Sequence, residues 1–435
     1  MPKYTIAWMP GDGVGKDVMD AARIVLDALK FDAEYPHADI GWEFWCSEGE
    51  ALPQRTIDLL RKTKCGLFGA ITSKPNDEAQ EELAPELRSK GLIYRSPIVR
   101  LRQLFNLHTN LRPCKAYPGN PLNYRGDDVD LVVFRENTEG SYGGVEFHPI
   151  PQHVYEALCA NPNMKKFGDK GLQNLALSTR IMSRQGCESI CRQAFMYAKK
   201  HKRKSVTLIE KPNVLRETGG LMTRVFRQVA RDFPNIPAWE ANIDAICMWL
   251  LKKPQEYDVL VAENMFGDII SDLAAGLVGG LGYAASANLG DTYAVFEPTH
   301  GSAPKYAGQY KVNPMAMLLT CVLMFEWLGE SDYARKLESA VAQVTRERRV
   351  GTYDVGLKNS TLEVAEEIAR VATGKPASSG STRPASSASS SAKSKPSRKP
   401  ANSSSKSAAT KPAHSKSAKS SAKSKSKPKV KAARR

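Results

Sequence analysis

The stretch Tyr4–Gly15, which reads YTIAWMPGDGVG, decides the fold class of this chain. Its first part, Tyr4–Met9, is an apolar run of strand length, and the turn Pro10–Gly15 that follows contains three glycines. Beyond the turn, apolar residues recur at the spacing of one helix face, at Val18, Ala22, Val25, Leu26 and Leu29. A strand, a glycine turn and a helix in this order predict the first unit of an α/β fold.

The same alternation of strand and helix patterns continues along the chain. We expect further strands at residues 66–70, 130–134, 205–209, 258–262 and 294–297, and helices that include 180–200 and 219–232. Because the strand segments are nearly continuous apolar runs, they indicate a mainly parallel sheet that helices cover on both faces. Residues 151–175 show neither period, which indicates an inserted segment.

The glycine turn itself has two interpretations. Gly11, Gly13 and Gly15 stand where a phosphate cradle lies in dinucleotide-binding folds. Their spacing differs from the GxGxxG pattern of that cradle, which favours a tight strand-to-helix turn. Taken alone, the motif leaves both interpretations open.

The positive charge of the chain is confined to its C-terminal end. Among 435 residues there are 62 Lys or Arg and 46 Asp or Glu, a net charge of +16. Residues 373–435 contain 13 Lys, 4 Arg and no acidic residue, so residues 1–372 carry 45 basic and 46 acidic side chains, a net charge of −1. The overall basicity therefore says nothing about the function of the body. The last segment is rich in Ser, Ala, Lys and Pro and lacks core-forming side chains, which predicts a disordered tail.

Composition also excludes several classes of protein. No run approaches the roughly 18 apolar residues of a membrane-spanning helix, and the chain does not start with a secretory signal. The eight cysteines are scattered and form no CxxC pair, which argues against a disulfide framework and a zinc site. We therefore expect a cytoplasmic protein with reduced thiols.

Two aspartates in the segment 264–273, NMFGDIISDL, are candidate metal ligands. Asp268 and Asp272 are four residues apart, so on a helix they share one face, and we expect Ile269 and Ile270 to point toward the core. Two adjacent carboxylates repel unless a cation joins them, and hard oxygen ligands favour Mg²⁺ or Mn²⁺. The alternative is a pair of solvated acids on an exposed helix.

Three arginines and a lysine lie near predicted strand ends. Arg102, Arg112 and Arg135 offer the planar forks that bind carboxylates, and Arg135 directly follows the apolar run 130–134. Lys211 follows the run 205–209, where a ligand of a parallel sheet is expected. Together the arginines suit a substrate with two or three carboxylates, although each alone is typical of a surface ion pair.

In this order the motifs resemble the β-decarboxylating dehydrogenases, the family of isocitrate, isopropylmalate, homoisocitrate and tartrate dehydrogenases. The resemblance covers about residues 4–370 and rests on the segments 10–15, 110–114, 135–142, 211–215, 264–273 and 296–306. It implies the two-domain α/β fold of that family, which is not a true Rossmann fold. The implied large domain comprises residues 1–110 and 255–372, the small domain comprises 111–254, and the tail of 373–435 lies outside the resemblance.

The resemblance also implies roles for individual residues. Arg102, Arg112 and Arg135 match the arginines that hold the malate moiety, and Tyr142 and Lys211 match the acid and the base. The aspartates matching the metal ligands are Asp244, Asp268 and Asp272. The residues matching the cofactor pocket are Glu297, His300, Gly301, Ala303, Lys305, Tyr306, Asn313 and Tyr353. In that family Lys211 and Asp244 would come from the neighbouring subunit, which implies a homodimer with shared active sites.

The cofactor and substrate are inferred by comparison within the family. Lys305, Tyr306 and Tyr353 match the residues that contact the 2′-phosphate of NADP, whereas Leu357 departs from that pattern and the adjacent Lys358 is a substitute. Ser96 matches a residue that reads the γ-carboxylate of isocitrate, but Ile98 stands where an Asn is typical. Arg95 and Arg100 are candidates for compensating charge. We rank isocitrate first, with homoisocitrate and 3-isopropylmalate as alternatives.

The implied reaction is the metal-dependent oxidation of a 2-hydroxy-3-carboxy acid, followed by loss of CO₂ and proton return to the carbon. Lys211 would take the hydroxyl proton through a relay, and Tyr142 would protonate the enolate. A protein of another class also stays open, because the tail resembles those of linker histones: a nucleic-acid-binding protein built on an inactive dehydrogenase body. Against that alternative, every catalytic position named above holds the required residue type.

Overall fold

The computed structural model describes residues 2–376, which lie in one compact unit. Of the disordered tail predicted at residues 373–435, residues 377–435 lie outside the described part of the chain. The division of the body into two domains stays a prediction. Within residues 2–376, no helix is both long enough and apolar enough to span a membrane.

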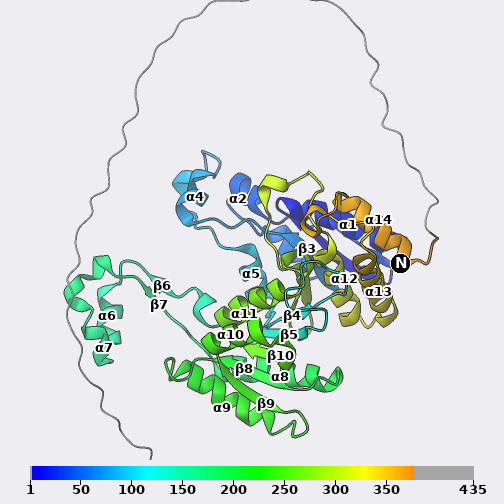
Figure 1. Cartoon of the computed structure of the whole chain (residues 1–435). Helices are drawn as coiled ribbons and strands as arrows, with labels where there is room; N and C mark the ends of the chain where they lie inside the picture. The colour runs from blue at the N-terminus through cyan, green and yellow to red at the C-terminus, as the bar shows by residue number, and fades with distance from the viewer. Residues whose placement is uncertain (1, 377–435) are drawn as a thin grey trace, which may run out of the picture. The chain divides into compact units, whose positions relative to one another are not determined.

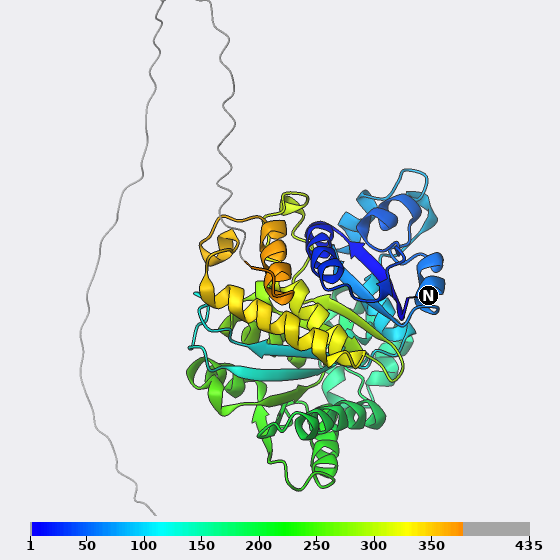
Figure 2. The ribbon, with the colours of Figure 1, turned by 90° about the vertical axis from the view of Figure 1, so that its right-hand side faces the viewer.

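A ten-stranded mixed sheet forms the centre of the molecule (Figures 1 and 2). Its strands are β1 (Tyr4–Gly11), β2 (Ala33–Glu34), β3 (Cys65–Ala70), β4 (Thr109–Lys115), β5 (Asp130–Glu136), β8 (Val206–Glu210), β9 (Ala238–Asn242), β10 (Val259–Ala262), β11 (Ala285–Leu289) and β12 (Ala294–Pro298). Their order across the sheet is β2-β1-β3-β12-β11-β4-β5-β10-β8-β9. All six strands expected from the sequence are therefore confirmed, within one or two residues at most ends.

The middle of the sheet departs from the expected parallel arrangement. β4 runs antiparallel to both β5 and β11, and β11 runs antiparallel to β12, whereas the other pairs are parallel. β4 and β11 lack a continuous apolar run because they carry buried polar residues such as Asn110, Arg112 and Asn288. Hydrophobic patterning therefore misses these two strands, although they carry part of the site described below.

Helices cover the sheet on both faces, as expected. The helices of the body are α1 (Val14–Ala28), α2 (Trp42–Glu48), α3 (Gln54–Leu60), α4 (Asn76–Glu81), α5 (Pro97–Leu104), α8 (Arg184–Lys200), α9 (Thr218–Ala230), α10 (Ile243–Lys252), α11 (Asn264–Leu277), α12 (Met315–Trp327), α13 (Ser331–Glu347) and α14 (Thr361–Ala372). Alternate residues of β5 show the two faces: Val132 and Phe134 belong to the core cluster that contains α8 and α12, whereas Leu131 and Val133 pack with α10 and α11.

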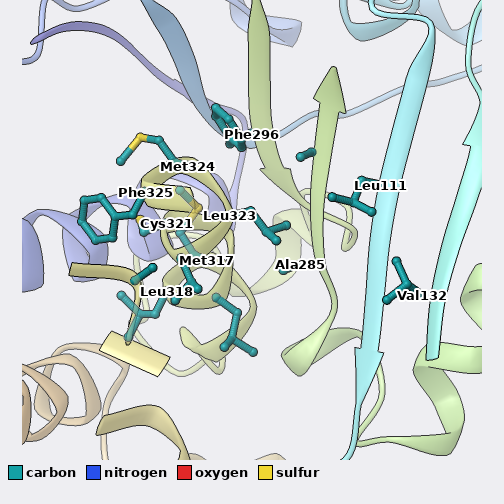
Figure 3. Packing of buried hydrophobic residues seen from close by; sticks show 14 of the residues in the cluster. Leu111, Val132, Ala285, Phe296, Met317, Leu318, Cys321, Leu323, Met324 and Phe325 are labelled. Carbon is teal, nitrogen blue, oxygen red and sulfur yellow. The ribbon is translucent and has the colours of Figure 1, made fainter. Parts of the chain in front are cut away.

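Helix α12 is the most deeply buried helix segment of that larger core. Its buried side chains include Met317, Leu318, Cys321 and Phe325, and the helix has no continuous polar face (Figure 3). Burying apolar surface on this scale is the main favourable term in folding. The core therefore fixes β4, β5, β11 and β12 against α12 and leaves the strand ends free for function.

The inserted segment expected at residues 151–175 forms an arm that projects from the body (Figure 1). It contains α6 (Gln152–Leu158) and α7 (Pro162–Lys165), and a small antiparallel sheet of β6 (Glu146–Phe147) and β7 (Leu177–Ser178) flanks it on either side. A bridge between Gly140 and Ile181 closes the base of the arm. The next helix, expected from residue 180, begins only at Arg184, where the Ser183 hydroxyl caps it.

The glycine turn after β1 is a packing device. A Cβ on Gly11 would lie 2.0 Å from the carbonyl oxygen of Ala70, and one on Gly13 would lie 2.1 Å from that of Ser302. The amide of Val14 at the start of α1 donates to the Ser302 carbonyl at 2.8 Å. The loop around Ser302 thus occupies the place a phosphate would take, which supports the interpretation as a tight turn.

The last described residues cap the C-terminal end of helix α14. Ser360 and Glu363 form a capping box at its start. At its end, the Lys375 amide donates to the Arg370 carbonyl, and the Arg370 guanidinium donates back to the Lys375 carbonyl. The helix cap therefore extends past the tail boundary expected at residue 373, to about Pro376.

Candidate active site

Helix α11 carries the two candidate metal ligands on one face. Nη1 of Arg112 lies 3.2 Å from Oδ1 of Asp268 and 3.1 Å from Oδ1 of Asp272, so both carboxylates converge on one cation. Burial raises the pKa of Asp272, with the Arg112 charge opposing that rise. The expectation for the intervening pair is half correct: Ile270 is buried, but Ile269 is 50% exposed, because adjacent helix residues diverge by about 100°.

Arg135 and Tyr142 join the same cluster. The Arg135 guanidinium hydrogen-bonds Asp268 through Nη1, and its Nε and Nη2 donate to Oδ1 of Asn264 at 3.0 and 2.8 Å. The Tyr142 hydroxyl donates to Oδ2 of Asp268 at 3.3 Å, and its ring lies 5.6 Å from the guanidinium carbon of Arg135. The predicted acid therefore stands beside a predicted carboxylate-binding arginine and a predicted metal ligand.

A buried amide network, which the sequence did not indicate, aims the arginines. Oδ1 of Asn288 accepts from Nε of Arg102 at 3.0 Å and from the amides of Asn110 and Asn137, both at 2.9 Å. Oδ1 of Asn110 in turn accepts from Nε of Arg112 at 2.6 Å. Because all three amides are buried on β4, β11 and the loop after β5, only the antiparallel pairing of the strands brings them together.

The cluster contains three arginines that are largely buried. Burial lowers the pKa of Arg102, and burial together with the charges of Arg112 and Arg102 lowers that of Arg135. Burial and the neighbouring Asp268 carboxylate raise the pKa of Tyr142, so its hydroxyl keeps its proton. Buried guanidinium groups that repel one another are stabilised by an anionic ligand. The arrangement can bind a polycarboxylate and present a proton to it.

Lys211 and Asp244 lie apart from this cluster. The Lys211 ammonium hydrogen-bonds the Asp244 carboxylate, and this bond lowers the pKa of Asp244. Among residues 2–376, neither side chain makes a hydrogen bond or ion pair with Asp268 or Asp272. No group of three or more His, Cys, Asp or Glu side chains in this range is placed to hold a metal. One chain thus gathers only two of the three predicted metal ligands.

The segment before Arg102 corrects two details of the substrate reasoning. Ile98 is buried in a core cluster with Leu101, so it does not line the site. Arg100 forms an ion pair with Glu50 and, with Arg95, lines a separate cavity of 360 Å³. Its charge is therefore already neutralised. Ser96 precedes α5 and is half-buried, and its hydroxyl makes no capping bond to that helix.

Glu297 and His300 begin the predicted cofactor pocket at the end of β12. Glu297 accepts hydrogen bonds from Nη2 of Arg102 at 3.2 Å and from the Asn288 amide at 2.7 Å, which connects the pocket to the arginine cluster. Nδ1 of His300 contacts the Gly301 carbonyl at 3.0 Å, and its buried Nε2 has no partner within the described residues. A Cβ added to Gly301 would meet open space. Because Nε2 of His300 lacks a hydrogen-bond partner, it suits a ligand whose heterocycle forms hydrogen bonds.

The loop that follows gathers cations and tyrosines. Ala303 has the left-handed φ of 36°, and the next residues turn Lys305 over the Tyr306 ring at 4.9 Å. The Tyr306 and Tyr353 ring centroids lie 6.1 Å apart. Asn313 does not point freely at this site, because its amide donates to Asp354 and accepts from the Met315 amide, both at 3.0 Å.

A cavity of 430 Å³ opens beside these tyrosines. Its lining residues are Tyr306, Lys311, Tyr353, Leu357, Lys358 and Asn359. Lys358 was predicted as a substitute cation from the family resemblance. Lys311 also lines this cavity and was not predicted from the sequence. Two lysines at the rim of an open cavity suit a phosphate group.

Comparison with known proteins identifies a matching family and several relatives. A family model described as isocitrate/isopropylmalate dehydrogenase matches residues 5–368. The chain is 39% identical to protein DlpA of Legionella pneumophila over 83% of its own length and 58% of that protein. It is 40% identical to 3-isopropylmalate dehydrogenase of Methanothermobacter thermautotrophicus over 85% of its length and 99% of that enzyme.

A solved structure shows the same fold. The crystal structure of isocitrate dehydrogenase from Methylococcus capsulatus aligns with a TM-score of 0.74 at 36% identity, covering 85% of this chain and 99% of that one. The family model and these alignments give the same result: the chain belongs to the isocitrate/isopropylmalate dehydrogenase family, whose members are decarboxylating dehydrogenases of hydroxy acids.

Proposed function

We propose that this protein catalyses the metal-dependent oxidative decarboxylation of a 2-hydroxy-3-carboxy acid, converting isocitrate and NADP⁺ to 2-oxoglutarate, CO₂ and NADPH. The observation that supports this most is the contact set around Asp268. Arg112, Arg135 and Tyr142 all reach its carboxylate, so carboxylate binding, metal binding and proton donation would occur within one cluster.

The residues present fit a hard divalent cation. Asp268 and Asp272 of one chain would hold Mg²⁺ or Mn²⁺, with Asp244 of a second copy as the third carboxylate. Both carboxylates face one positive group, Nη1 of Arg112, which supports a cation at this place. When bound, the metal supplies a Lewis acid for developing negative charge and NADP⁺ accepts the hydride from carbon.

The protein's own groups bind the substrate and move protons. Arg102, Arg112 and Arg135 would fix the substrate carboxylates in one orientation, since buried guanidinium forks bind them in a bidentate way. Lys211 would take the hydroxyl proton as base, and Tyr142 would return a proton to the carbon that loses CO₂. The raised pKa of Tyr142 suits an acid that stays protonated until it donates its proton to the substrate carbon.

The separation of Lys211 from Asp268 supports a shared site between two copies of the chain. An exposed apolar face lies on the adjacent helices α10 and α11, made of Met248, Trp249, Leu251 and Ile269. Exposed apolar side chains gathered on adjacent helices favour an association surface. A second copy packed on this face would cover it and bring a Lys211–Asp244 pair to each Asp268–Asp272 pair.

The cations of the 430 Å³ cavity support NADP over NAD. Lys311 and Lys358 line the cavity together with Tyr306 and Tyr353, Lys305 lies 4.9 Å from the Tyr306 ring, and no acidic side chain lines the cavity. An acid there would hold ribose hydroxyls but repel a 2′-phosphate, whereas a lysine attracts it.

Isocitrate stays our first substrate, and 3-isopropylmalate is the second. Ser96, with its uncapped hydroxyl near the start of α5, supports a polar γ-substituent. The neutralised Arg100 and the relative from Methanothermobacter support an apolar one, and Val99 stands one helical turn before Arg102. No single residue therefore decides whether the γ-substituent of the substrate is polar or apolar.

A substrate panel tests the proposed function. Purified protein with Mg²⁺ would be assayed by absorbance at the reduced nicotinamide band with isocitrate, homoisocitrate, 3-isopropylmalate and tartrate, each with NADP⁺ and NAD⁺. The proposal predicts the highest kcat/KM for isocitrate with NADP⁺. No turnover of any of these acids, with metal and either cofactor, would contradict it and favour the inactive-body alternative.

For the tail we propose an added, separate property. Residues 377–435 carry 16 of the 17 C-terminal positive charges and no acidic residue. A chain of this composition binds polyanions such as nucleic acid by releasing counterions, without reading sequence.

A further inference from the structure

Arg180 lies at the base of the arm, outside any helix, and its side chain is only 10% exposed. Its Nη2 donates to Oε2 of Glu210 at 2.8 Å, and its Nε faces Oε2 of Glu263 at 3.6 Å. Glu210 and Glu263 are each 1% exposed. One buried guanidinium therefore stands between two buried carboxylates that end neighbouring parallel strands, β8 and β10.

Each of these carboxylates also holds a part of the proposed machinery. Oε1 of Glu210 accepts from the amide of Lys211, the proposed base, at 2.8 Å. Oε1 of Glu263 accepts from the Phe266 amide at 2.7 Å and so caps α11, the helix of Asp268. The residue after Glu263 is Asn264, which accepts the hydrogen bonds of Arg135.

The third connection runs to the proposed acid. Gly140 pairs with Ile181, the residue after Arg180, through an amide-to-carbonyl bond of 2.8 Å. A Cβ on Gly140 would lie 2.8 Å from Oε2 of Glu263, so the loop packs directly on that carboxylate. Tyr142 follows two residues later. The position of its ring therefore depends on the same buried group.

We propose that Arg180 is a positioning residue that joins the base-bearing end of β8, the start of α11 and the loop of Tyr142 into one rigid unit. This rests on the proposed function for the roles of Lys211 and Tyr142. If Lys211 contributes to the active site of the partner while Tyr142 and Asp268 contribute to the active site of their own chain, Arg180 connects the two active sites of a dimer. No surface ion pair achieves this, because solvent-exposed pairs contribute little to rigidity.

The main test is Arg180→Lys, with Arg192→Lys as the matched control. Arg192 also bridges two acids, Glu188 and Asp232, but on the exposed surface of α8. Lysine keeps the charge but lacks the fork that reaches two carboxylates at once. We expect kcat to fall about ten- to a hundredfold, as a displacement of about 1 Å does, with KM changed by less than about threefold. The control variant should keep both constants.

A second readout does not depend on activity. Amide hydrogen exchange of peptides covering residues 138–143, 210–215 and 263–268 should be about tenfold faster in Arg180→Lys, with the rest of the body unchanged. Wild-type kcat together with unchanged exchange in all three peptides would overturn the inference. If the wild type has no turnover but the three peptides respond together, the proposed function fails and the inference stands.

The variant Arg180→Met tests the charge balance through its pH dependence. Burial already raises the pKa of Glu210, and the Arg180 charge opposes that rise. Without the guanidinium, the pKa of buried Glu210 should rise further above the unfolded value of about 4.3. Groups with raised pKa values are tolerated while protonated, so the stability deficit against wild type should grow as pH rises from about 5 to 8. The double variant Arg180→Met/Glu210→Gln should reduce that pH-dependent deficit. A deficit independent of pH would contradict the role assigned to Arg180.

Discussion

The hydroxyl of Tyr142 donates to Oδ2 of Asp268 at 3.3 Å across two segments that are 126 residues apart in sequence. The same carboxylate accepts from Arg135 through its other oxygen, so one side chain organises an acid and a cation. A substrate that replaces the bonds to Asp268 would receive both groups already oriented. This preorganisation avoids the entropy of assembling them during the reaction.

The variant Asp268→Asn should lose activity while keeping its fold. We expect kcat to fall at least about a hundredfold, because loss of even an outer-sphere group around a metal costs about 10- to 100-fold. Thermal unfolding with and without Mn²⁺ supplies the second measurement: the metal should stabilise the wild type and not the variant. Asp58→Asn, an exposed aspartate of α3, is the matched control. Wild-type turnover at limiting metal would show that Asp268 is not a ligand.

The variant Tyr142→Phe should separate proton return from substrate binding. Removing a general acid typically lowers a rate by about 10²–10⁴. Substrate affinity, measured by calorimetry with Mg²⁺, should change little because the three arginines remain. Tyr155→Phe, on the arm, is the matched control. An unchanged kcat would show that another group protonates the carbon.

The variant Lys305→Asp should reverse the preference for NADP⁺ over NAD⁺. A charge-assisted bond to the 2′-phosphate is worth roughly 1.5–3 kcal/mol, which is about ten- to a hundredfold in kcat/KM. Lys311→Met should cause a smaller loss with NADP⁺ alone, and Lys336→Met, on α13, should cause none. Equal kcat/KM for the two cofactors in the wild type would contradict the assignment of this cavity.

Truncation after Pro376 should remove the tail without disturbing the body, since the cap of α14 is complete at that point. Kinetic constants should stay within about twofold of the full chain. Any binding of the full chain to duplex DNA at low salt should weaken steeply as salt rises and should disappear on truncation. A truncated protein with the same affinity and salt slope would place the binding on the body.

Much of the fold was predictable from the sequence because its signal is local. The run Tyr4–Met9, its glycine turn and the following helix are contiguous, and they appear in the structure as predicted. The strand of Arg112 was missed because its buried positions are polar, so its burial depends on partners far away in sequence. The exposure of Ile269 was also missed, because an exposed isoleucine cannot be told from a buried one by its residue type.

The candidate site shows the same division. The resemblance of short motifs predicted Asp268, Asp272 and the three arginines, and the structure brings these residues together. No motif indicated Asn288, Lys311 or Arg180, since each acts through contacts that only the folded chain creates. The neutralisation of the Arg100 charge was also not predictable from the sequence, because its ion-pair partner Glu50 lies 50 residues earlier.

The most direct test of the account mixes two inactive variants. Lys211→Met removes the proposed base and Asp268→Asn removes a proposed metal ligand. If each site combines Lys211 of one copy with Asp268 of the other, random mixing of the two variants gives one intact site in each mixed dimer. The account predicts recovery of about one quarter of wild-type activity after the subunits are exchanged by co-expression. Activity no higher than that of either variant alone, with mixed dimers present, would contradict the shared site.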